Sequence, residues 1–275
     1  MKDFKTQKQI ENVETFFENE HLRWKSLYKE KYIPTDLAKI KRKIISSNFI
    51  SKYLQKNSKI LDVGCGAGMV SLELVNQGYK IEGIDVSKKM INLCEEQFKS
   101  LKINRDKFKF KEGNIFELDL KENSYDGIIA LGFLEYQKIE STSLDYLYKI
   151  LKPNGFIVIS GPNNLRLYNY FNLVKIIEKM RNIFFLKSKE NSRDYETISL
   201  HRYNIHKFKK LFINSNFTYL ECKQHSYAGL RYLNKLIGIK GQFFLYVLFS
   251  KFFEFIKINR FADDIIVVGK KVDKN

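Results

Sequence analysis

Short apolar runs alternate with longer amphipathic stretches between residues 58 and 160. In the longer stretches, apolar residues recur every three or four positions, which is the period of a helix with one buried face. The short runs predict buried strands, which we place at 59–63, 80–84, 107–112, 126–131 and 155–160. Strands and helices that alternate in this order are typical of βαβ units. We therefore expect an α/β fold with a doubly wound, mostly parallel sheet and helices on both faces.

The segments on either side of this alternation have a different texture. Before it, apolar residues at helical spacing predict helices over 4–20 and 35–53. After it, residues 161–200 are aromatic and basic without a clear period. We place the remaining elements at a helix over 204–213, a strand over 216–225, an aromatic helical stretch over 229–257 and an apolar strand over 264–269.

These changes divide the chain into three parts of one domain. Residues 1–57 form an N-terminal helical extension, 58–160 form the core, and 161–275 supply a lid, helices and closing strands. Hydrophobic residues make up 44% of the chain and aromatic residues 15%, which excludes a disordered polymer. Only three prolines are present, so nothing indicates a linker-dominated architecture.

The charge is distributed unevenly. The formal net charge is +17, yet residues 58–160 hold 14 basic and 15 acidic side chains, whereas 161–275 hold 21 and 9. Two interpretations stay open. The basic flanks form a surface for phosphates or anionic lipids, or the sequence simply favours lysine throughout.

Cysteine usage and the termini bear on the compartment. The three cysteines are an odd number without close pairing, which favours a reducing environment. The first residues lack the apolar segment of a signal peptide, and the longest uninterrupted apolar run, 243–249, is too short to span a bilayer. We expect a cytoplasmic protein, with peripheral contact at the inner membrane surface as one alternative.

The segment that carries candidate chemistry is a strand that ends in glycines and opens a helix. Residues 60–68 read Ile-Leu-Asp-Val-Gly-Cys-Gly-Ala-Gly. Glycines let the backbone turn tightly and approach a ligand, and the first turn of the helix presents unpaired amides. Seventeen residues after Gly68, Asp85 ends the second strand, where its carboxylate can accept hydrogen bonds from both hydroxyls of a ribose. We predict a nucleotide site.

The spacing of the loop separates two cofactor classes. Dinucleotide enzymes favour G-x-G-x-x-G, whereas Gly64, Gly66 and Gly68 give G-x-G-x-G, preceded by Asp62. This pattern resembles the first motif of class I S-adenosylmethionine-dependent methyltransferases, [D/E]-x-G-x-G-x-G. The resemblance implies S-adenosyl-L-methionine as cofactor, with Cys65 as a small loop residue beside it rather than a nucleophile. It disfavours a nicotinamide dehydrogenase.

The resemblance continues in order along the chain. It implies that Val86 or Met90 flanks the adenine, and that Asn114, followed by Ile115, holds the adenine amino group where the family often has aspartate. Leu131, in a run similar to the fourth-strand motif, is the expected contact of the methionine moiety. The match makes 58–160 a Rossmann-like, S-adenosylmethionine-binding core. It also implies a seven-stranded sheet, with the two late strands as its sixth and seventh.

The motif that follows the fourth strand indicates the class of methyl acceptor. Nucleic-acid amino-methyltransferases of this family carry (Asp/Asn)-Pro-Pro-(Tyr/Phe) there, but residues 131–134 read Leu-Gly-Phe-Leu. The Leu-Glu-Tyr at 134–136 is similar to quinone-biosynthesis and related small-molecule O- or C-methyltransferases. We therefore expect a small-molecule acceptor or one linked to a lipid or saccharide. An RNA or DNA methyltransferase, favoured by the net charge, and a non-catalytic cofactor-binding partner protein stay open as alternatives.

A hydroxyl acceptor would need a nearby base, for which histidine is the usual candidate. In small-molecule members of the family a histidine-containing segment after the fifth strand often faces the acceptor, so we predict His201 as the base or an acceptor ligand. His206, Tyr136 and Asn163 are weaker candidates. No metal-ligand spacing is present, and the sequence predicts no metal site.

The aromatic stretch 229–257 has two interpretations. It is either a lid that forms one wall of an apolar pocket, or an amphipathic interfacial helix pair in contact with a membrane. Lysines are interspersed among its leucines and phenylalanines, which would suit anionic headgroups. The sequence makes no prediction of the oligomeric state.

Overall fold

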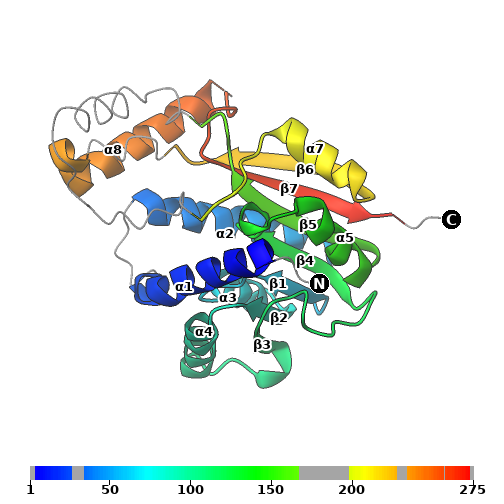
Figure 1. Ribbon diagram of the computed structural model, residues 1–275. Helices are drawn as coiled ribbons and strands as arrows, with labels where there is room; N and C mark the ends of the chain where they lie inside the picture. The colour runs from blue at the N-terminus through cyan, green and yellow to red at the C-terminus, as the bar shows by residue number, and fades with distance from the viewer. Residues whose placement is uncertain (1–3, 27–33, 167–197, 228–233, 257, 273–275) are drawn as a thin grey trace.

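The computed structural model describes residues 4–26, 34–166, 198–227, 234–256 and 258–272. Within these segments the chain forms a seven-stranded sheet in the order β3-β2-β1-β4-β5-β7-β6, with helices on both faces (Figure 1). The strands are β1 (Lys59–Val63), β2 (Lys80–Asp85), β3 (Phe108–Glu112), β4 (Tyr125–Leu131), β5 (Leu151–Pro162), β6 (Phe217–His225) and β7 (Asp264–Lys271).

The helices occupy the positions that the sequence pattern predicts, with small differences at their ends. They are α1 (Phe4–Ser26), α2 (Pro34–Tyr53), α3 (Met69–Asn76), α4 (Lys88–Ser100), α5 (Glu140–Ile150), α7 (Ile205–Asn214) and α8 (Asn234–Phe255), with short 3-10 turns η1 (Arg105–Lys107) and η2 (Leu134–Tyr136). None of the helices in the described part of the chain is both long and apolar enough to cross a membrane.

Strand direction confirms the predicted fold class. β1 pairs in parallel with β2 and β4, and β3 and β5 continue the parallel sheet on either side. β7 lies between β5 and β6 and runs antiparallel to both. The chain order reverses between β1 and β4, and doubly wound sheets bind their ligands at the carboxyl ends of the strands beside such a switch point.

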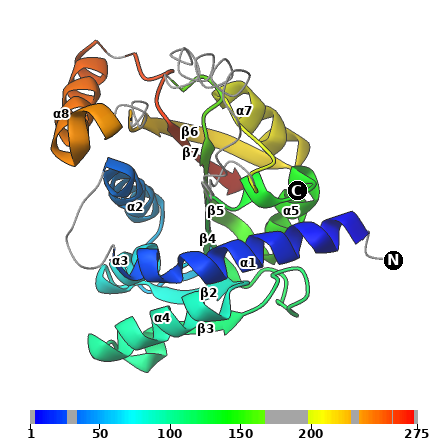
Figure 2. The same cartoon turned by 60° about the vertical axis from the view of Figure 1, so that its left-hand side comes forward.

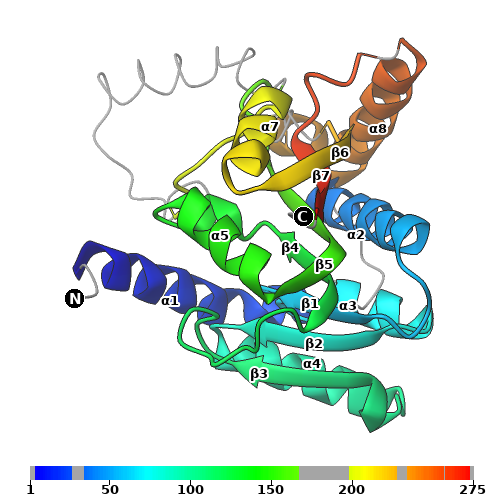
Figure 3. The ribbon, with the colours of Figure 1, turned by 90° about the vertical axis from the view of Figure 1, so that its right-hand side faces the viewer.

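The core has two layers, one on each face of the sheet. α5 and α7 pack on one face, and α2, α3 and α4 pack on the other (Figure 3). The sequence of β7 is a continuous apolar run because the strand is buried on both faces. Ile265 and Val267 belong to the first layer and Ile266 and Val268 to the second, and all four are fully buried. Each such side chain contributes about 1.5–3 kcal/mol on burial.

Several element boundaries differ from the sequence prediction, and α1, for example, continues to Ser26 rather than ending near residue 20. β5 begins at Leu151 rather than near residue 155, because Leu151 pairs with Tyr125 across an irregularity in the β4–β5 register. α8 consists of two helical pieces joined by a kink at Gly238, whose φ is 62°. The predicted stretch began at 229, and its first residues lie outside the described segments.

The N-terminal extension holds two helices with different tasks. α2 packs against the sheet through Ile50, which is fully buried. α1 runs across the molecule beside α4, at the ends of the parallel strands (Figure 2). The N-terminal extension therefore contributes to the expected ligand site, because α1 covers the carboxyl ends of the parallel strands.

Candidate active site

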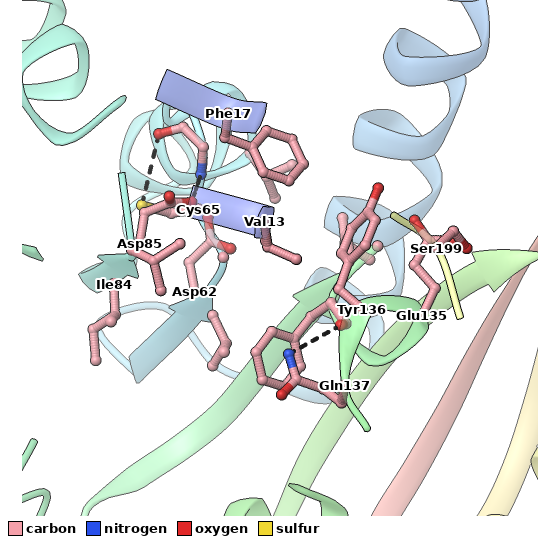
Figure 4. Close-up of a pocket in the computed structure, with 18 of the residues that line it drawn as sticks. Val13, Phe17, Asp62, Cys65, Ile84, Asp85, Glu135, Tyr136, Gln137 and Ser199 are labelled. Carbon is pink, nitrogen blue, oxygen red and sulfur yellow. Dashed lines mark hydrogen bonds between the residues drawn. The ribbon is translucent and has the colours of Figure 1, made fainter. Parts of the chain in front are cut away.

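One cavity of about 420 Å³ lies at the carboxyl ends of the parallel strands. The loops after β1, β2, β3 and β4 line it from the sheet side, and α1 and α2 from the other (Figure 4). Nine of the predicted cofactor-binding residues line this cavity: Asp62, Gly64, Cys65, Gly66, Asp85, Val86, Asn114, Ile115 and Leu131. Three predicted site residues, Gly68, Met90 and His201, are not among its lining residues.

The glycine loop adopts the conformation that its sequence requires. Gly64, Gly66 and Gly68 have φ values of 68°, 52° and 74°, in the left-handed region that favours glycine. A Cβ built on Gly68 would lie 2.8 Å from Sγ of Cys94, so this glycine allows the loop to pack on α4. A Cβ on Gly66 would meet nothing within 4 Å, which leaves space beside the loop.

Asp85 ties this loop to the end of β2. Its Oδ2 accepts a hydrogen bond from the Gly66 amide at 2.8 Å, and its Oδ1 accepts one from the Ser87 amide at 2.9 Å. Burial raises the pKa of Asp85 to about 6, against the effect of these two amides. Each carboxylate oxygen has a second lone pair, so the side chain can still accept hydrogen bonds from a ligand in the cavity.

Asp62, the acidic residue of the motif, holds the other side of the loop. Its Oδ2 accepts a hydrogen bond from the Ser71 hydroxyl of α3 at 2.6 Å. Burial raises the pKa of Asp62 to about 6, and the nearby charge of Asp85 acts in the same direction. The two carboxylates therefore fix the loop between β1, β2 and α3.

The side predicted to hold adenine is built by the ends of β2 and β3. Oδ1 of Asn114 accepts a hydrogen bond from the Phe116 amide at 3.2 Å, and its Nδ2 donates to Glu117 at 3.3 Å. Phe116 also lines the cavity, although the sequence did not single it out. Met90 is fully buried beneath α1, in a cluster with Ala67 and Leu93, which places it one layer behind the cavity.

α1 forms the roof of the cavity through Val13 and Phe17. The Phe17 ring meets the Tyr136 ring edge-on, with 5.6 Å between centroids. The sequence carried a signal for this role, because Ile10, Val13 and Phe17 form an apolar stripe on an otherwise polar helix. What covers that stripe could not be read from spacing alone.

Polar contacts hold α1 against both rims of the cavity. On one rim, Glu18 accepts hydrogen bonds from the Ser87 hydroxyl at 2.7 Å and the Lys89 amide at 2.9 Å, and the Met90 amide donates to the same hydroxyl oxygen. On the other rim, Nε2 of Gln9 donates to the Ile198 carbonyl at 2.9 Å. α1 is therefore fixed across the opening.

The far half of the cavity is rich in charge. Figure 4 shows Glu135 and Ser199 on the side away from Asp62 and Asp85. Burial raises the pKa of Glu135, and the charges of three arginines that also line the cavity oppose this shift. These arginines are Arg42, Arg202 and Arg166. They come from α2 and from segments after β5 that are far apart in the sequence, so spacing gave no sign that they meet.

His201 lies beside the charged half of the cavity, but its ring faces Gln137 and Glu140 rather than the cavity. Its Nε2 is 2.8 Å from the Gln137 carbonyl, and its Nδ1 is 3.5 Å from Glu140. The backbone amide of Leu200 also donates to the Glu135 carbonyl at 2.7 Å. These contacts join the segment at 200–201 to the turn after β4. The geometry thus gives His201 a supporting position and does not favour it as a base.

The weaker candidates are placed differently. Tyr136 lines the cavity. Asn163 is fully buried, and its Nδ2 donates to the carbonyls of Arg260 and Ala262, which makes it a structural tie. His206, on α7, does not line the cavity. Neither does any described residue of α8, the predicted lid, whose place over the cavity is taken by α1.

Comparison with known proteins agrees with this geometry. A family model described as "Methyltransferase domain" matches residues 54–216. A demethylmenaquinone methyltransferase from Oceanobacillus iheyensis is 29% identical over 186 residues, which are 64% of this chain and 75% of that one. A ubiquinone biosynthesis O-methyltransferase from Rickettsia conorii is 33% identical over 120 residues, and this match spans 44% of this chain but only 38% of the relative.

A solved structure shares the whole fold. The magnesium protoporphyrin IX methyltransferase from Synechocystis, determined with bound S-adenosylhomocysteine, superposes with a TM-score of 0.64 at 14% identity. The match covers 94% of this chain and 98% of that one. Since the family model matches more than half of the chain, the protein belongs to the methyltransferase-domain family. It is an S-adenosylmethionine-dependent methyltransferase, as the glycine loop predicted.

The cavity fits this cofactor on its own geometry. The left-handed glycine loop leaves open space at Gly66, and Asp85 stands at the end of β2 where a ribose would lie. Asn114 and Ile115 continue the same wall. Within the described residues, no group of three or more histidine, cysteine, aspartate or glutamate side chains is arranged to hold a metal ion.

Proposed function

We propose that the protein methylates a small-molecule acceptor that carries a lipid or saccharide tail. The observation that carries this proposal is the continuity of the cavity, which joins the glycine loop and Asp85 to the charged half around Glu135. A cofactor at the loop and an acceptor at Glu135 would lie in the same cavity. The names of the two quinone-biosynthesis relatives support an acceptor of this class.

The residues of this chain contribute mainly by position. S-adenosylmethionine supplies an electrophilic methyl group on a sulfonium. The thioether that remains after transfer is a good leaving group and needs no acid assistance. Asp85 and Asn114 would hold the nucleoside, Leu131 would border the methionine end, and α1 would cover the bound cofactor, since all of them line the cavity. Holding two reactants in a near-attack arrangement is worth up to about 7–11 kcal/mol. The charged half of the cavity would orient the acceptor and accept its proton where the acceptor atom is oxygen.

We also propose that α8 rests on an anionic membrane surface from which the acceptor is taken. Its outward face exposes Phe244, Leu248 and Phe255, with 65%, 49% and 85% of each side chain accessible. The inward face is different, since Tyr246 is 5% and Phe253 is 9% exposed. An apolar stripe of this size on the outside of a helix marks an interaction surface.

The charges around this stripe favour a membrane over an apolar protein partner. Lys240 and Lys251 are exposed on the same helix, and residues 161–275 carry 21 basic and 9 acidic side chains. Juxtaposed lysine and aromatic side chains are typical of helices that lie in the interface of anionic bilayers. The inward face also places α8 next to α2, which supplies Arg42 to the cavity.

The test is transfer of radiolabelled methyl from S-adenosylmethionine to hydroxylated aromatic probes, with and without an isoprenoid tail. The proposal predicts that tailed quinols are methylated with a lower KM than their tail-free analogues, and more so when presented in vesicles. Equal KM values for the tailed quinols and their tail-free analogues would show that the enzyme does not recognise the lipid tail. Methylation of RNA or DNA fragments in preference to every small probe would overturn it.

A further inference from the structure

A buried polar cluster closes the charged half of the cavity at the start of β7. Asp264, the first residue of this strand, pairs in register with Pro162 of β5 and His225 of β6. Because β7 runs antiparallel to its neighbour β5, its first residue lies at the edge where the parallel strands end. Asp264 and Pro162 both line the cavity.

Two nitrogen-bearing side chains flank the Asp264 carboxylate. Nη1 of Arg42 and Nε2 of His225 each lie 3.7 Å from Oδ2 of Asp264. Both distances exceed a direct hydrogen bond. Oδ1 accepts a hydrogen bond from the Ile265 amide at 3.1 Å. Oδ2 is thus the oxygen that faces Arg42 and His225.

The neighbours of the two ring nitrogens of His225 favour one tautomer. Its Nδ1 is 2.8 Å from the Ser226 hydroxyl, and that hydroxyl oxygen accepts a hydrogen bond from the Tyr246 hydroxyl of α8 at 3.2 Å. The Ser226 hydroxyl can donate to Nδ1, and the ionised Asp264 carboxylate beside Nε2 can only accept, so the tautomer with the ring hydrogen on Nε2 fits both neighbours. Nε2 is buried and has no hydrogen-bond partner in the described part of the chain. An unpartnered buried donor is rare in proteins, and this one is aimed at Asp264.

The electrostatics keep a proton-accepting group at this place near neutral pH. Burial raises the pKa of Asp264 to about 7, with Arg42 opposing the shift and Glu135 and Asp263 adding to it. Burial and nearby cations lower the pKa of His225 to about 3, so its ring stays neutral. A carboxylate with this pKa suits general-base chemistry at neutral pH.

The cluster also reaches the end of the cavity where the methyl group is expected. A Cβ built on Gly132 would lie 3.2 Å from Nη1 of Arg42. Gly132 follows Leu131 at the end of β4 and lines the same cavity. Arg42 therefore connects Asp264 to the strand that borders the methionine end of the cofactor site.

We propose that Asp264 is the general base that accepts the proton of a hydroxyl-bearing acceptor, with His225 as the residue that positions it. The inference rests on the proposed function and narrows it to O-methylation. The acceptor oxygen forms a bond to the methyl carbon, and the bond from that carbon to sulfur breaks with its electron pair going to sulfur. The hydroxyl proton passes to Oδ2 of Asp264 and from there to solvent.

The experiment compares Asp264→Asn with the wild-type protein and with Asp145→Asn, which makes the same change at an exposed site on α5. The probes are 3,4-dihydroxybenzoate and hydroquinone, assayed from pH 5.5 to 9. We expect D264N to lower kcat at least 100-fold with a smaller effect on KM, and to remove the rise of the rate near pH 7. Affinity for S-adenosylhomocysteine, measured by calorimetry, should stay within about twofold in both variants, because Asp264 lies on a strand outside the nucleotide half.

Three results would overturn the inference while leaving the proposed function standing. One is a D264N variant that keeps kcat within threefold of wild type. Another is an unchanged pH inflection in that variant. The third is a wild-type protein that binds S-adenosylmethionine but methylates neither hydroxyl probe. Failure of the proposed function is distinguishable, because the wild-type protein would then methylate RNA or DNA fragments in preference to every small-molecule probe.

The positioning role of His225 has a separate readout. His225→Leu removes the Nε2 hydrogen aimed at Asp264, so the ionised carboxylate loses a stabilising donor and the inflection should move upward by about one pH unit. His225→Gln restores a donor of similar reach and should return the inflection toward the wild-type value. A purely structural role predicts lower thermal stability in both variants and no movement of the inflection.

Discussion

At the scale of single residues, the carboxylate of Asp85 links pH to cofactor binding. Its pKa is raised to about 6 by burial, so the group is ionised above this pH and protonated below it. A protonated carboxyl loses acceptor capacity for the ribose hydroxyls. We expect the Kd for S-adenosylhomocysteine to rise about tenfold between pH 7.5 and pH 5, as measured by calorimetry at both values.

The matched control is the second buried carboxylate of the loop. Asp62 has a pKa raised to a similar value, but it is bonded to Ser71 of α3. Asp62→Asn should keep the pH dependence of cofactor affinity, and Asp85→Asn should bind weakly at every pH. A D85N variant with the wild-type pH dependence would show that another group is responsible.

The sequence predicted single residues correctly where the local backbone conformation permits only one residue type. The glycines at 64–68 are recognisable from sequence because their positive φ angles and close packing leave few alternatives. Asp264 and His225 were missed, because their meeting depends on the antiparallel register of two late strands 39 positions apart. His201 drew attention by its type and place in the chain, but the structure turns its ring toward Gln137 and Glu140.

At the scale of elements, α1 should control the escape of the cofactor. Phe17 closes the roof against Tyr136, and Glu18 fixes the helix to the start of α4. Phe17→Ala removes the ring contact and opens the roof to water. We expect S-adenosylhomocysteine to dissociate about tenfold faster, as measured by stopped-flow fluorescence. Mutations that weaken binding usually act mainly on the dissociation rate.

Leu22 offers the control on the same helix, because its side chain is 67% exposed and does not line the cavity. Leu22→Ala should leave the dissociation rate unchanged. Equal rates for F17A and the wild-type protein would mean that α1 does not close the site. The pattern of apolar residues predicted this helix, but only packing shows what its apolar stripe covers.

At the scale of the whole molecule, the exposed stripe of α8 predicts binding to anionic vesicles. We expect the protein to sediment with vesicles of mixed phosphatidylglycerol and phosphatidylcholine, less with phosphatidylcholine alone, and less again as salt is raised. The double change Phe244→Ser and Phe255→Ser should reduce binding about tenfold or more, because it removes two largely exposed aromatic side chains.

The control for the vesicle experiment is Ile213→Ser on α7, where a side chain that is 69% exposed lies on a different helix. This variant should bind vesicles as the wild-type protein does. Salt-resistant binding, or equal loss in both variants, would remove α8 as the contact. The overall architecture was predictable because apolar runs and helical spacing define each element, whereas the placement of α1 and α8 depends on contacts between distant segments.

Calorimetric titration of the purified protein with S-adenosylmethionine, S-adenosylhomocysteine and NAD in parallel would decide whether the glycine loop and Asp85 form the cofactor site. We expect binding of the first two with Kd values in the micromolar range, no binding of NAD, and loss of both affinities in Asp85→Ala with the circular dichroism spectrum retained. Binding of NAD alone, or undiminished affinity in the Asp85→Ala variant, would contradict this cofactor assignment.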